Sequence, residues 1–361
     1  AEWRLSGIAK VGVVRLAGVE FAIEPKVPLE RLFYLLARGR GWGTWFSESV
    51  QLGTIPELYP AIAEAFAVWA ERVLGSGVLR GYRELRGAEP TVRGKWLVEE
   101  QVRIRHGLPL PAELMFDDFT ADIPENQLVR SAARRVLAFA GLPSGMYGRL
   151  RRIDRQLGDA ALLTRGDLLP TIRFDRRNER YRPLLALSEL ILTNGSHDHR
   201  VSSTAATGFL LDLPQVFESF VETEMKRAVR PFGGDIVAQA VSSFDRDGHA
   251  KIKPDLLWRR GERVIAVFDA KYKAEKPAGF PNADIYQMLA YCIRHRLASG
   301  HLIYAAGTEA PRRYLVEQAG VVIYCHSLAL DATPADLSRQ VEEIVALSAV
   351  GEVAVVDRPR P

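Results

Sequence analysis

The chain has 361 residues, 47% of them hydrophobic and 25% charged, a composition typical of a folded globular protein. The formal net charge of +4 permits an acidic partner without requiring one. No apolar run approaches the length that a helix needs to span a bilayer. The first residues lack a charged-then-apolar signal pattern, and Cys292 and Cys325 lie in apolar-patterned segments. We therefore expect a cytoplasmic protein with reduced thiols and no membrane partner.

The first half of the chain predicts a mixture of helices and strands. Residues 8–27 alternate apolar with small or polar residues, which indicates a β-hairpin or a pair of short strands. Helices are predicted over 29–38, 56–75, 126–140 and 178–193, a β-rich region over 80–122, and a glycine-rich loop with two tryptophans over 39–45. The polar stretch 194–208 is either a flexible loop or a domain boundary.

The pattern after residue 209 is more compact. The predicted order is a helix over 214–229, strands near 235–244, 251–258 and 264–271, a helix over 284–298, and short strands at 301–305 and 321–325. This order is typical of an α/β (α+β) unit built around a small mixed sheet.

Lysine is rare in this chain and unevenly placed. Of 48 basic residues only nine are lysines, and five of these fall between 251 and 276. The compact charge of a lysine can approach a phosphate closely, and the pKa of the lysine itself can change with its surroundings. The pKa of an arginine does not change in this way. The cluster therefore directs attention to the strand at 264–271.

Period-two alternation places the side chains of this strand on two faces. We expect one face to carry Val264, Ala266, Phe268 and Ala270, and the other to carry Ile265, Val267, Asp269 and Lys271. If residues 259–263 form a hairpin turn, Asp255 comes close to Asp269. Two adjacent carboxylates repel each other, and a divalent cation such as Mg²⁺ removes that penalty. A lysine beside the metal could orient or deprotonate a water, or neutralise developing negative charge.

Two neighbouring helices offer further candidates. Glu218 lies between Phe217 and Phe220, which are expected to face the core, and its carboxylate could complete a metal shell. Gln287 and Tyr291 are four residues apart and share one helix face, which is either a set of site residues or a solvated surface. An ordinary turn aspartate remains the alternative for each acidic residue. We interpret His295 and His301 as surface or core histidines.

Several segments in order resemble one known family. They are VGVVRLAGVEFAIEPKVP, GVLRGYRE, FDDFTADIPENQLVRSA, RRNERYRPLLALSELIL, FLLDLPQVFESFV, DAKYK and NADIYQMLAYC. The chain resembles the McrC family, the nuclease subunits of McrBC modification-dependent restriction systems. Its C-terminal part resembles the PD-(D/E)xK nuclease superfamily, with Asp255, Asp269 and Lys271 at the motif positions.

The resemblance implies a magnesium-dependent endonuclease that cuts double-stranded DNA when assembled with a hexameric AAA+ GTPase, McrB, whose GTP hydrolysis it stimulates. Asp255, Asp269 and Glu218 resemble the metal ligands, Lys271 the catalytic lysine and Gln287 the glutamine of the following helix. GTP is expected on the partner, and the sequence agrees because it contains no G-x-x-x-x-G-K-[ST] phosphate loop.

The expected organisation has three parts. Residues 1–165 form a partner-docking domain, 166–208 a helical connector with a polar loop, and 209–361 the nuclease domain. In the docking domain, the loop with Arg38, Arg40, Trp42 and Trp45 is a candidate contact by composition. Two other functions stay open, a catalytically silent adaptor of the motor and a stand-alone nuclease. The arginines of 173–182 either contact phosphates or form a solvated face.

Overall fold

The computed structural model describes the chain over 10–16, 19–25, 27–40, 58–106, 108–139, 141–164, 166–194, 206–272, 280–305 and 312–356. These residues divide into two compact units. One contains residues 1–13, 21–56 and 210–361, and the other contains residues 14–20 and 57–209. Residues 21–40 therefore belong to the same unit as the C-terminal segment. No helix in the described ranges is long and apolar enough to cross a membrane.

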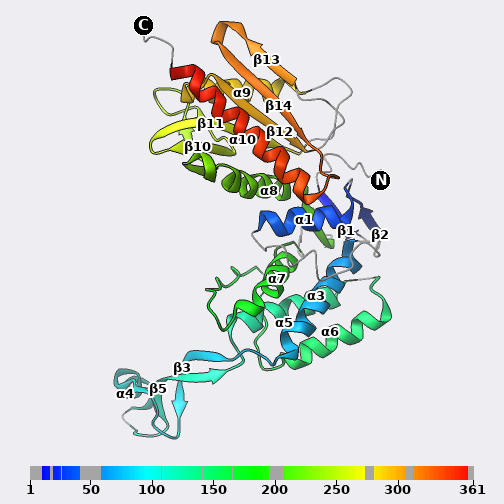
Figure 1. The fold of residues 1–361 in the computed structure, drawn as a ribbon. Helices are drawn as coiled ribbons and strands as arrows, with labels where there is room; N and C mark the ends of the chain where they lie inside the picture. The colour runs from blue at the N-terminus through cyan, green and yellow to red at the C-terminus, as the bar shows by residue number, and fades with distance from the viewer. Residues whose placement is uncertain are drawn as a thin grey trace. The chain divides into compact units, whose positions relative to one another are not determined.

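A mixed sheet forms the centre of the C-terminal unit (Figure 1). Its described strands run in the order β13-β14-β12-β11-β10-β7. Strands β11, β12 and β14 are parallel, whereas β7, β10 and β13 pair antiparallel with their neighbours. The bounds are β7 Asp235–Ala238, β10 Leu256–Arg260, β11 Arg263–Lys271, β12 Ser299–Ala305, β13 Arg312–Val316 and β14 Val321–Leu328.

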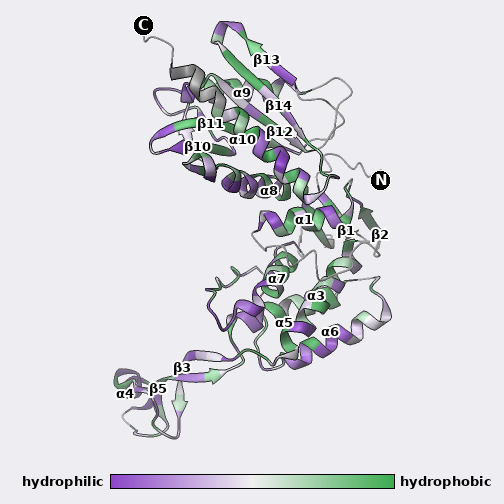
Figure 2. Ribbon diagram, in the orientation of Figure 1, coloured by the Kyte–Doolittle hydropathy of each residue, from purple (hydrophilic) through white to green (hydrophobic). Residues whose placement is uncertain are grey.

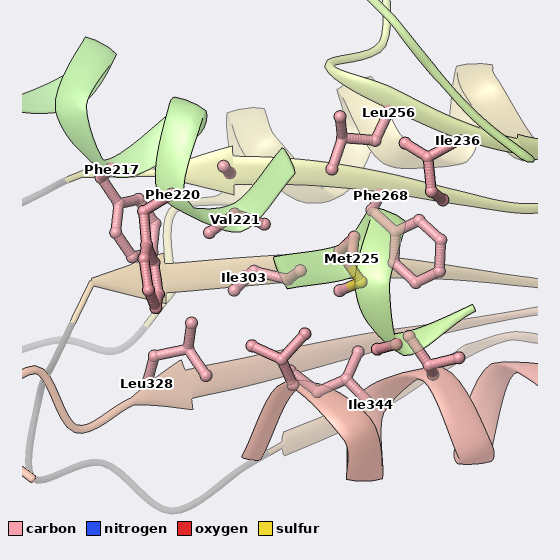
Figure 3. Close-up of a cluster of buried hydrophobic side chains, with 14 of the residues drawn as sticks. Phe217, Phe220, Val221, Met225, Ile236, Leu256, Phe268, Ile303, Leu328 and Ile344 are labelled. Carbon is pink, nitrogen blue, oxygen red and sulfur yellow. The ribbon is translucent and has the colours of Figure 1, made fainter. Parts of the chain in front are cut away.

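Helices cover both faces of this sheet. On one face, α8 (Leu213–Ala228) and α10 (Pro334–Val356) pack over a fully buried cluster that includes Phe217, Phe268 and Ile303 (Figure 3). On the other face, α9 (Asn282–His295) packs over a second buried cluster. Helix α1 (Leu29–Gly39) joins the first cluster through Leu35.

Gly300 of β12 explains how closely α9 approaches the sheet. A Cβ atom at Gly300 would lie 2.5 Å from the Met288 sulfur and 2.6 Å from the Cys292 sulfur, both on α9. Real Cβ atoms do not approach other atoms this closely, so a larger residue at position 300 would require Met288 and Cys292 to shift. The position of α9, and of the polar residues it carries, therefore depends on this glycine.

The predicted strand at 235–244 is two elements in the structure. Strand β7 ends at Ala238, and Gln239 takes a left-handed conformation with φ of 52°. The chain then forms β8 (Ser242–Ser243), which pairs with β9 (Lys251–Ile252) across the DRDG turn. The predicted strand at 251–258 is likewise divided, because Pro254 and its neighbours separate β9 from β10.

The hairpin of β10 and β11 is present, but the residues on each face of β11 are not all those that strict alternation predicts. A bulge between Trp258 and Arg259 shifts the pairing by one residue, so that Trp258 is opposite Ala266 and Arg259 is opposite Val264. Ile265 therefore joins the cluster under α8 and α10, and Val264 packs on the α9 side. The prediction was wrong for these two residues, because one extra residue in a strand resets its alternation.

The second unit combines a helical group with a β-rich extension. Helices α3 (Leu58–Gly75), α5 (Pro124–Leu137), α6 (Ser144–Gln156) and α7 (Arg182–Asn194) form the group, and a short 3₁₀ helix, Glu179–Tyr181, precedes α7. The extension, which we call the finger (81–120), contains β3 (Gly81–Glu89), β4 (Lys95–Trp96), α4 (Val98–Arg105) and β5 (Ala112–Thr120). Figure 2 shows apolar segments within both parts.

The remaining strands are short. Strands β1 (Lys10–Leu16), β2 (Val19–Ile23) and β6 (Ala206–Asp212) form a sheet in the order β2-β1-β6. The strand pair expected over 8–27 is therefore present. Trp42, Trp45 and most of the polar stretch 194–208 lie outside the described residues. Helix α6, strand β13 and helix α10 have no counterpart in the elements predicted from the sequence.

Candidate active site

Asp255 stands just before β10 and is held by donors on both of its carboxylate oxygens. The Ala270 backbone amide of β11 donates to its Oδ2 at 2.9 Å, and the Gln239 side-chain amide donates to its Oδ1 at 3.0 Å. The first of these bonds crosses the hairpin. It ties Asp255 to the residue between Asp269 and Lys271, so the two acidic positions are neighbours in space.

Asp269 and Lys271 lie at the end of β11, on the side that α9 covers. Asp269 is only 2% exposed, and its carboxylate forms an ion pair with the Lys271 ammonium. The pKa of Asp269 is raised to about 6, first by burial and then by the nearby charge of Asp255, while Lys271 opposes both effects. Burial alone would lower the pKa of Lys271, but Asp269, Asp284 and Asp255 outweigh it and the net pKa is raised. Lys271 is therefore positively charged at neutral pH in this state.

Glu218 approaches the same place from α8. The pKa of its carboxyl is raised to about 7, first by burial and then by the charges of Asp255 and Asp269, while Lys271 opposes these effects. Glu218 is half-buried at the border between the apolar face of α8 and the acidic pair. Side chains from α8, from the segment before β10 and from β11 therefore share one electrostatic environment.

Gln287 and Tyr291 of α9 form a hydrogen-bonded chain that reaches Lys271. The Lys271 ammonium donates to Gln287 Oε1 at 2.9 Å, and Gln287 Nε2 donates to the Tyr291 hydroxyl at 2.7 Å. The Tyr291 hydroxyl in turn donates to the Lys253 carbonyl at 3.2 Å. Burial raises the pKa of Tyr291, and the charges of Asp269 and Asp255 raise it further. Gln287 and Tyr291 therefore belong to the candidate site and are not merely a solvated helix surface.

Asp284 is an acidic residue of this neighbourhood that sequence reasoning did not select. It is 4% exposed in the first turn of α9 and accepts a hydrogen bond from the Tyr304 hydroxyl at 3.0 Å. Its charge contributes to the raised pKa of Lys271. The available signal was its position on the polar stripe of α9 with Gln287 and Tyr291. The helical pattern could not reveal its bond to Tyr304, because that residue lies on β12, outside the helix.

The donor chemistry around Asp255 suits a hard divalent cation, although the side chains do not converge as placed. Glu218, Asp255 and Asp269 supply carboxylate oxygens, which are the ligands that Mg²⁺ prefers. Their mutual effect on pKa shows an excess of negative charge that a cation would relieve. Within the described ranges, however, no three His, Cys, Asp or Glu side chains come close enough to hold a metal ion. The residues are neighbours, not a preformed ligand set.

The other polar candidates have structural partners. His301 is fully buried and its Nδ1 lies 3.1 Å from His326 Nε2, so it is a core histidine. Burial lowers the pKa of His301 well below its usual value and that of His326 to about 4.

The arginine-rich stretch 173–182 is largely paired within its own unit. Arg177 forms an ion pair with Asp175, and Arg182 forms one with Glu179. Arg180 donates to the carbonyls of Ser76 and Gly77 at 3.2 and 2.8 Å. These contacts favour a surface role for the paired arginines over direct contact with phosphate.

A mixed sheet between helices, with acidic residues and a lysine where β10 and β11 meet, is the α/β arrangement expected from the sequence. The family described as McrBC 5-methylcytosine restriction system component matches residues 7–305. The chain therefore belongs to the McrBC 5-methylcytosine restriction system component family.

One solved structure supports this fold. A chain of the refined half-complex from a tetradecameric assembly of Thermococcus gammatolerans McrB AAA+ hexamers with bound McrC matches with a TM-score of 0.60 and 19% identity, covering 94% of this chain and 82% of that one. A chain of the Thermococcus gammatolerans McrBC complex matches with a TM-score of 0.42 and 21% identity, over 61% of this chain and 67% of that one. A search of curated proteins found no match.

Proposed function

We propose that this chain is a magnesium-dependent endonuclease subunit that cuts double-stranded DNA carrying methylcytosine. In this proposal it acts in the cytoplasm, assembled with a hexameric AAA+ GTPase similar to McrB, and it stimulates that partner's GTP hydrolysis. The observation that carries the nuclease part is the cross-hairpin bond from the Ala270 amide to Asp255, which brings the two acidic positions and Lys271 together. Membership of the restriction-component family supports the biological setting.

Each residue has a role in phosphodiester hydrolysis. Asp255 and Asp269, with Glu218, would hold Mg²⁺, which when bound supplies a Lewis acid and a water of lowered pKa. The ammonium of Lys271 places a positive charge where negative charge develops on the phosphate. Gln287 accepts a hydrogen bond from that ammonium at 2.9 Å and so fixes its direction. An intact set of these residues favours a catalytic subunit over a silent adaptor.

The finger supports the existence of a protein partner. It exposes many large apolar side chains, whereas most of a folded chain's large apolar residues are buried. Those side chains are Tyr82, Val92, Trp96, Val98, Val102, Ile104, Leu108, Leu110 and Phe119. The structure of Thermococcus gammatolerans McrB AAA+ hexamers with bound McrC contains a chain of similar fold, which supports such a partner. We therefore assign the docking of the GTPase to the second unit, with the finger as its main contact.

Arg38 is a weaker candidate for the partner contact than the composition of its loop suggested. Its Nε donates to the carboxylate of Glu224, which has no exposed surface on α8. This interaction accounts for an arginine at the end of α1 without an external partner. The bond gives Arg38 a structural role within its own unit.

A cleavage assay tests the proposal. Methylated and unmethylated plasmids are incubated with Mg²⁺ and GTP, with and without the AAA+ protein encoded beside this chain, and with Asp269→Ala as the control. Cutting that requires partner, GTP and methylation supports the restriction subunit. Cutting without the partner establishes a stand-alone nuclease. Faster GTP hydrolysis with no cutting establishes the adaptor.

A further inference from the structure

Gln239 makes two separate hydrogen bonds to Asp255. Its backbone amide donates to the Asp255 carbonyl at 2.8 Å, and its side-chain Nε2 donates to the Asp255 carboxylate Oδ1 at 3.0 Å. Because the Ala270 amide occupies Oδ2, the two carboxylate oxygens receive donors from opposite directions. A carboxylate held at both oxygens has a fixed plane, and each oxygen keeps a lone pair for a further ligand.

The backbone of Gln239 is unusual for a residue with a side chain. Its φ is 52°, in the left-handed region where glycine is favoured. Only His106 and Arg296 share a positive φ among the described non-glycine residues, and each of them ends a helix, α4 and α9 respectively. Left-handed residues are ordinary at helix ends. Gln239 instead follows the end of strand β7, beside Asp255.

A glycine would fit this backbone with less strain, so the glutamine side chain requires a reason. The amide bond to Asp255 is the contact that the structure gives it. Strained conformations that persist beside a polar cluster are typical of functional positions. Residues that orient a ligand in this way affect metal affinity although they do not touch the metal.

We propose that Gln239 is a positioning residue that orients the Asp255 carboxylate for a divalent cation. This inference rests on the proposed function, because it assumes that Asp255 is a metal ligand. It adds a residue outside the acidic motif, supplied by the turn after β7. Gln239 acts through Asp255 and has no role of its own in the chemistry.

The test uses the full chain and the variant Gln239→Gly, which removes the amide and at the same time relieves the left-handed strain. Arg296→Gly is the matched control, since it makes the same backbone change at the far end of α9 in the same unit. Isothermal titration with Mg²⁺ measures affinity directly, and the plasmid assay measures cleavage. Thermal unfolding without metal, and stimulation of the partner's GTPase, report folding and docking.

We expect Gln239→Gly to weaken Mg²⁺ binding by about tenfold, the lower end of the effect of residues that support metal ligands, because the Gln239 amide is exposed. Its melting temperature should be equal or higher, GTPase stimulation unchanged, and cleavage restored by raising the Mg²⁺ concentration. Gln239→Asn, whose side chain is one methylene shorter, should not restore affinity.

Three results would overturn the inference. Wild-type affinity in Gln239→Gly would mean that the amide does not matter. An equal loss of affinity in Arg296→Gly would mean that the effect is a general one of glycine. Failure of the wild-type chain to bind Mg²⁺ or cut DNA would remove the proposed function together with this inference, whereas the first two results leave the proposed function standing.

Discussion

Arg38 of α1 donates to Glu224 of α8, and that carboxylate is completely buried in the C-terminal unit. Arg227 and Ser338 also donate to Glu224, at 3.2 and 2.9 Å, so the carboxylate joins α1, α8 and α10. A buried charge is tolerated only when it is well paired, since its desolvation is costly. Residues near the start of the chain are thereby tied to residues near its end.

The first prediction follows from this pairing. Arg38→Ala should lower the free energy of unfolding by about 1–3 kcal/mol, because it removes one charged donor from a buried carboxylate that keeps its other donors. Urea unfolding of the full chain measures the change. Arg31→Ala on the same helix is the control and should have a smaller effect. If Arg38→Ala kept its stability but no longer stimulated the partner's GTPase, Arg38 would be assigned to the contact with the partner.

The second prediction concerns Lys271. Lys271→Ala should reduce plasmid cleavage by at least about a hundredfold, the usual cost of removing a group that stabilises transition-state charge. Stimulation of the partner's GTPase should remain, because Lys271 is distant in sequence from the finger. Lys251→Ala, an exposed lysine of the same cluster, is the matched control. Loss of both activities in a folded Lys271→Ala protein would contradict the separation of cutting from docking.

The third prediction concerns the approach of α9 to the sheet. Gly300→Ala should destabilise the protein by about 1–3 kcal/mol, the range for overpacked cores, because its Cβ would meet two sulfur atoms of α9. Gly75→Ala is the control, since a Cβ there would meet nothing within 4 Å. Thermal and urea unfolding measure both. Equal stability of Gly300→Ala and wild type would show that α9 can move away without cost.

The fourth prediction is a pH dependence. The folded-state pKa of Glu218 is raised to about 7 by burial and by its acidic neighbours. A raised pKa means that the folded state holds this proton more tightly than the unfolded state does. Glu218 therefore favours folding at low pH, and that contribution is lost as the pH rises from the ordinary glutamate range toward about 7.

Glu218→Gln removes this titration. In the absence of Mg²⁺, its melting temperature relative to wild type should rise between pH 5 and pH 8. Glu222→Gln, on the same helix but paired with Lys226, is the control. If the difference in melting temperature between Glu218→Gln and wild type stayed constant across this range, the pKa of Glu218 would not be raised in the folded state. Saturating Mg²⁺ should reduce the difference at high pH, since a cation offsets the repulsion.

Local patterns predicted much of the C-terminal unit because its elements carry strong local signals. Alternation identified β11, and helical spacing identified α8 and α9 with their bounds displaced by one to three residues. Strand β13 carries adjacent arginines and exposed residues, so its sequence lacks the alternation that marks a half-buried strand. The acidic motif brought Asp255, Asp269 and Lys271 to attention before any geometry was known.

Other features depend on contacts between distant residues and leave no local signal. The bond from Tyr304 to Asp284 joins β12 to α9, and the bond from Arg38 to Glu224 joins helices 186 residues apart. Gln239 looks like an ordinary residue within an apolar segment. Its left-handed backbone occurs together with a bond to Asp255, and propensity scales do not register such a bond.

The bulge at Trp258 has a consequence for the spacing of the two acidic residues. In an antiparallel hairpin the residue numbers of facing pairs have a constant sum, and here that sum is 524 from Leu256 to Trp258 but 523 beyond the bulge. Extended by one residue, the first register sets Asp255 directly opposite Asp269. Without the bulge, Asp255 would face Phe268, whose side chain belongs to the opposite side of the sheet from Asp269. Around a two-residue turn without a bulge, facing residues are an odd number of positions apart. The even separation of fourteen between Asp255 and Asp269 therefore indicates the bulge. If one residue were deleted from this hairpin, the two aspartates could stay opposite each other only if the bulge were lost as well.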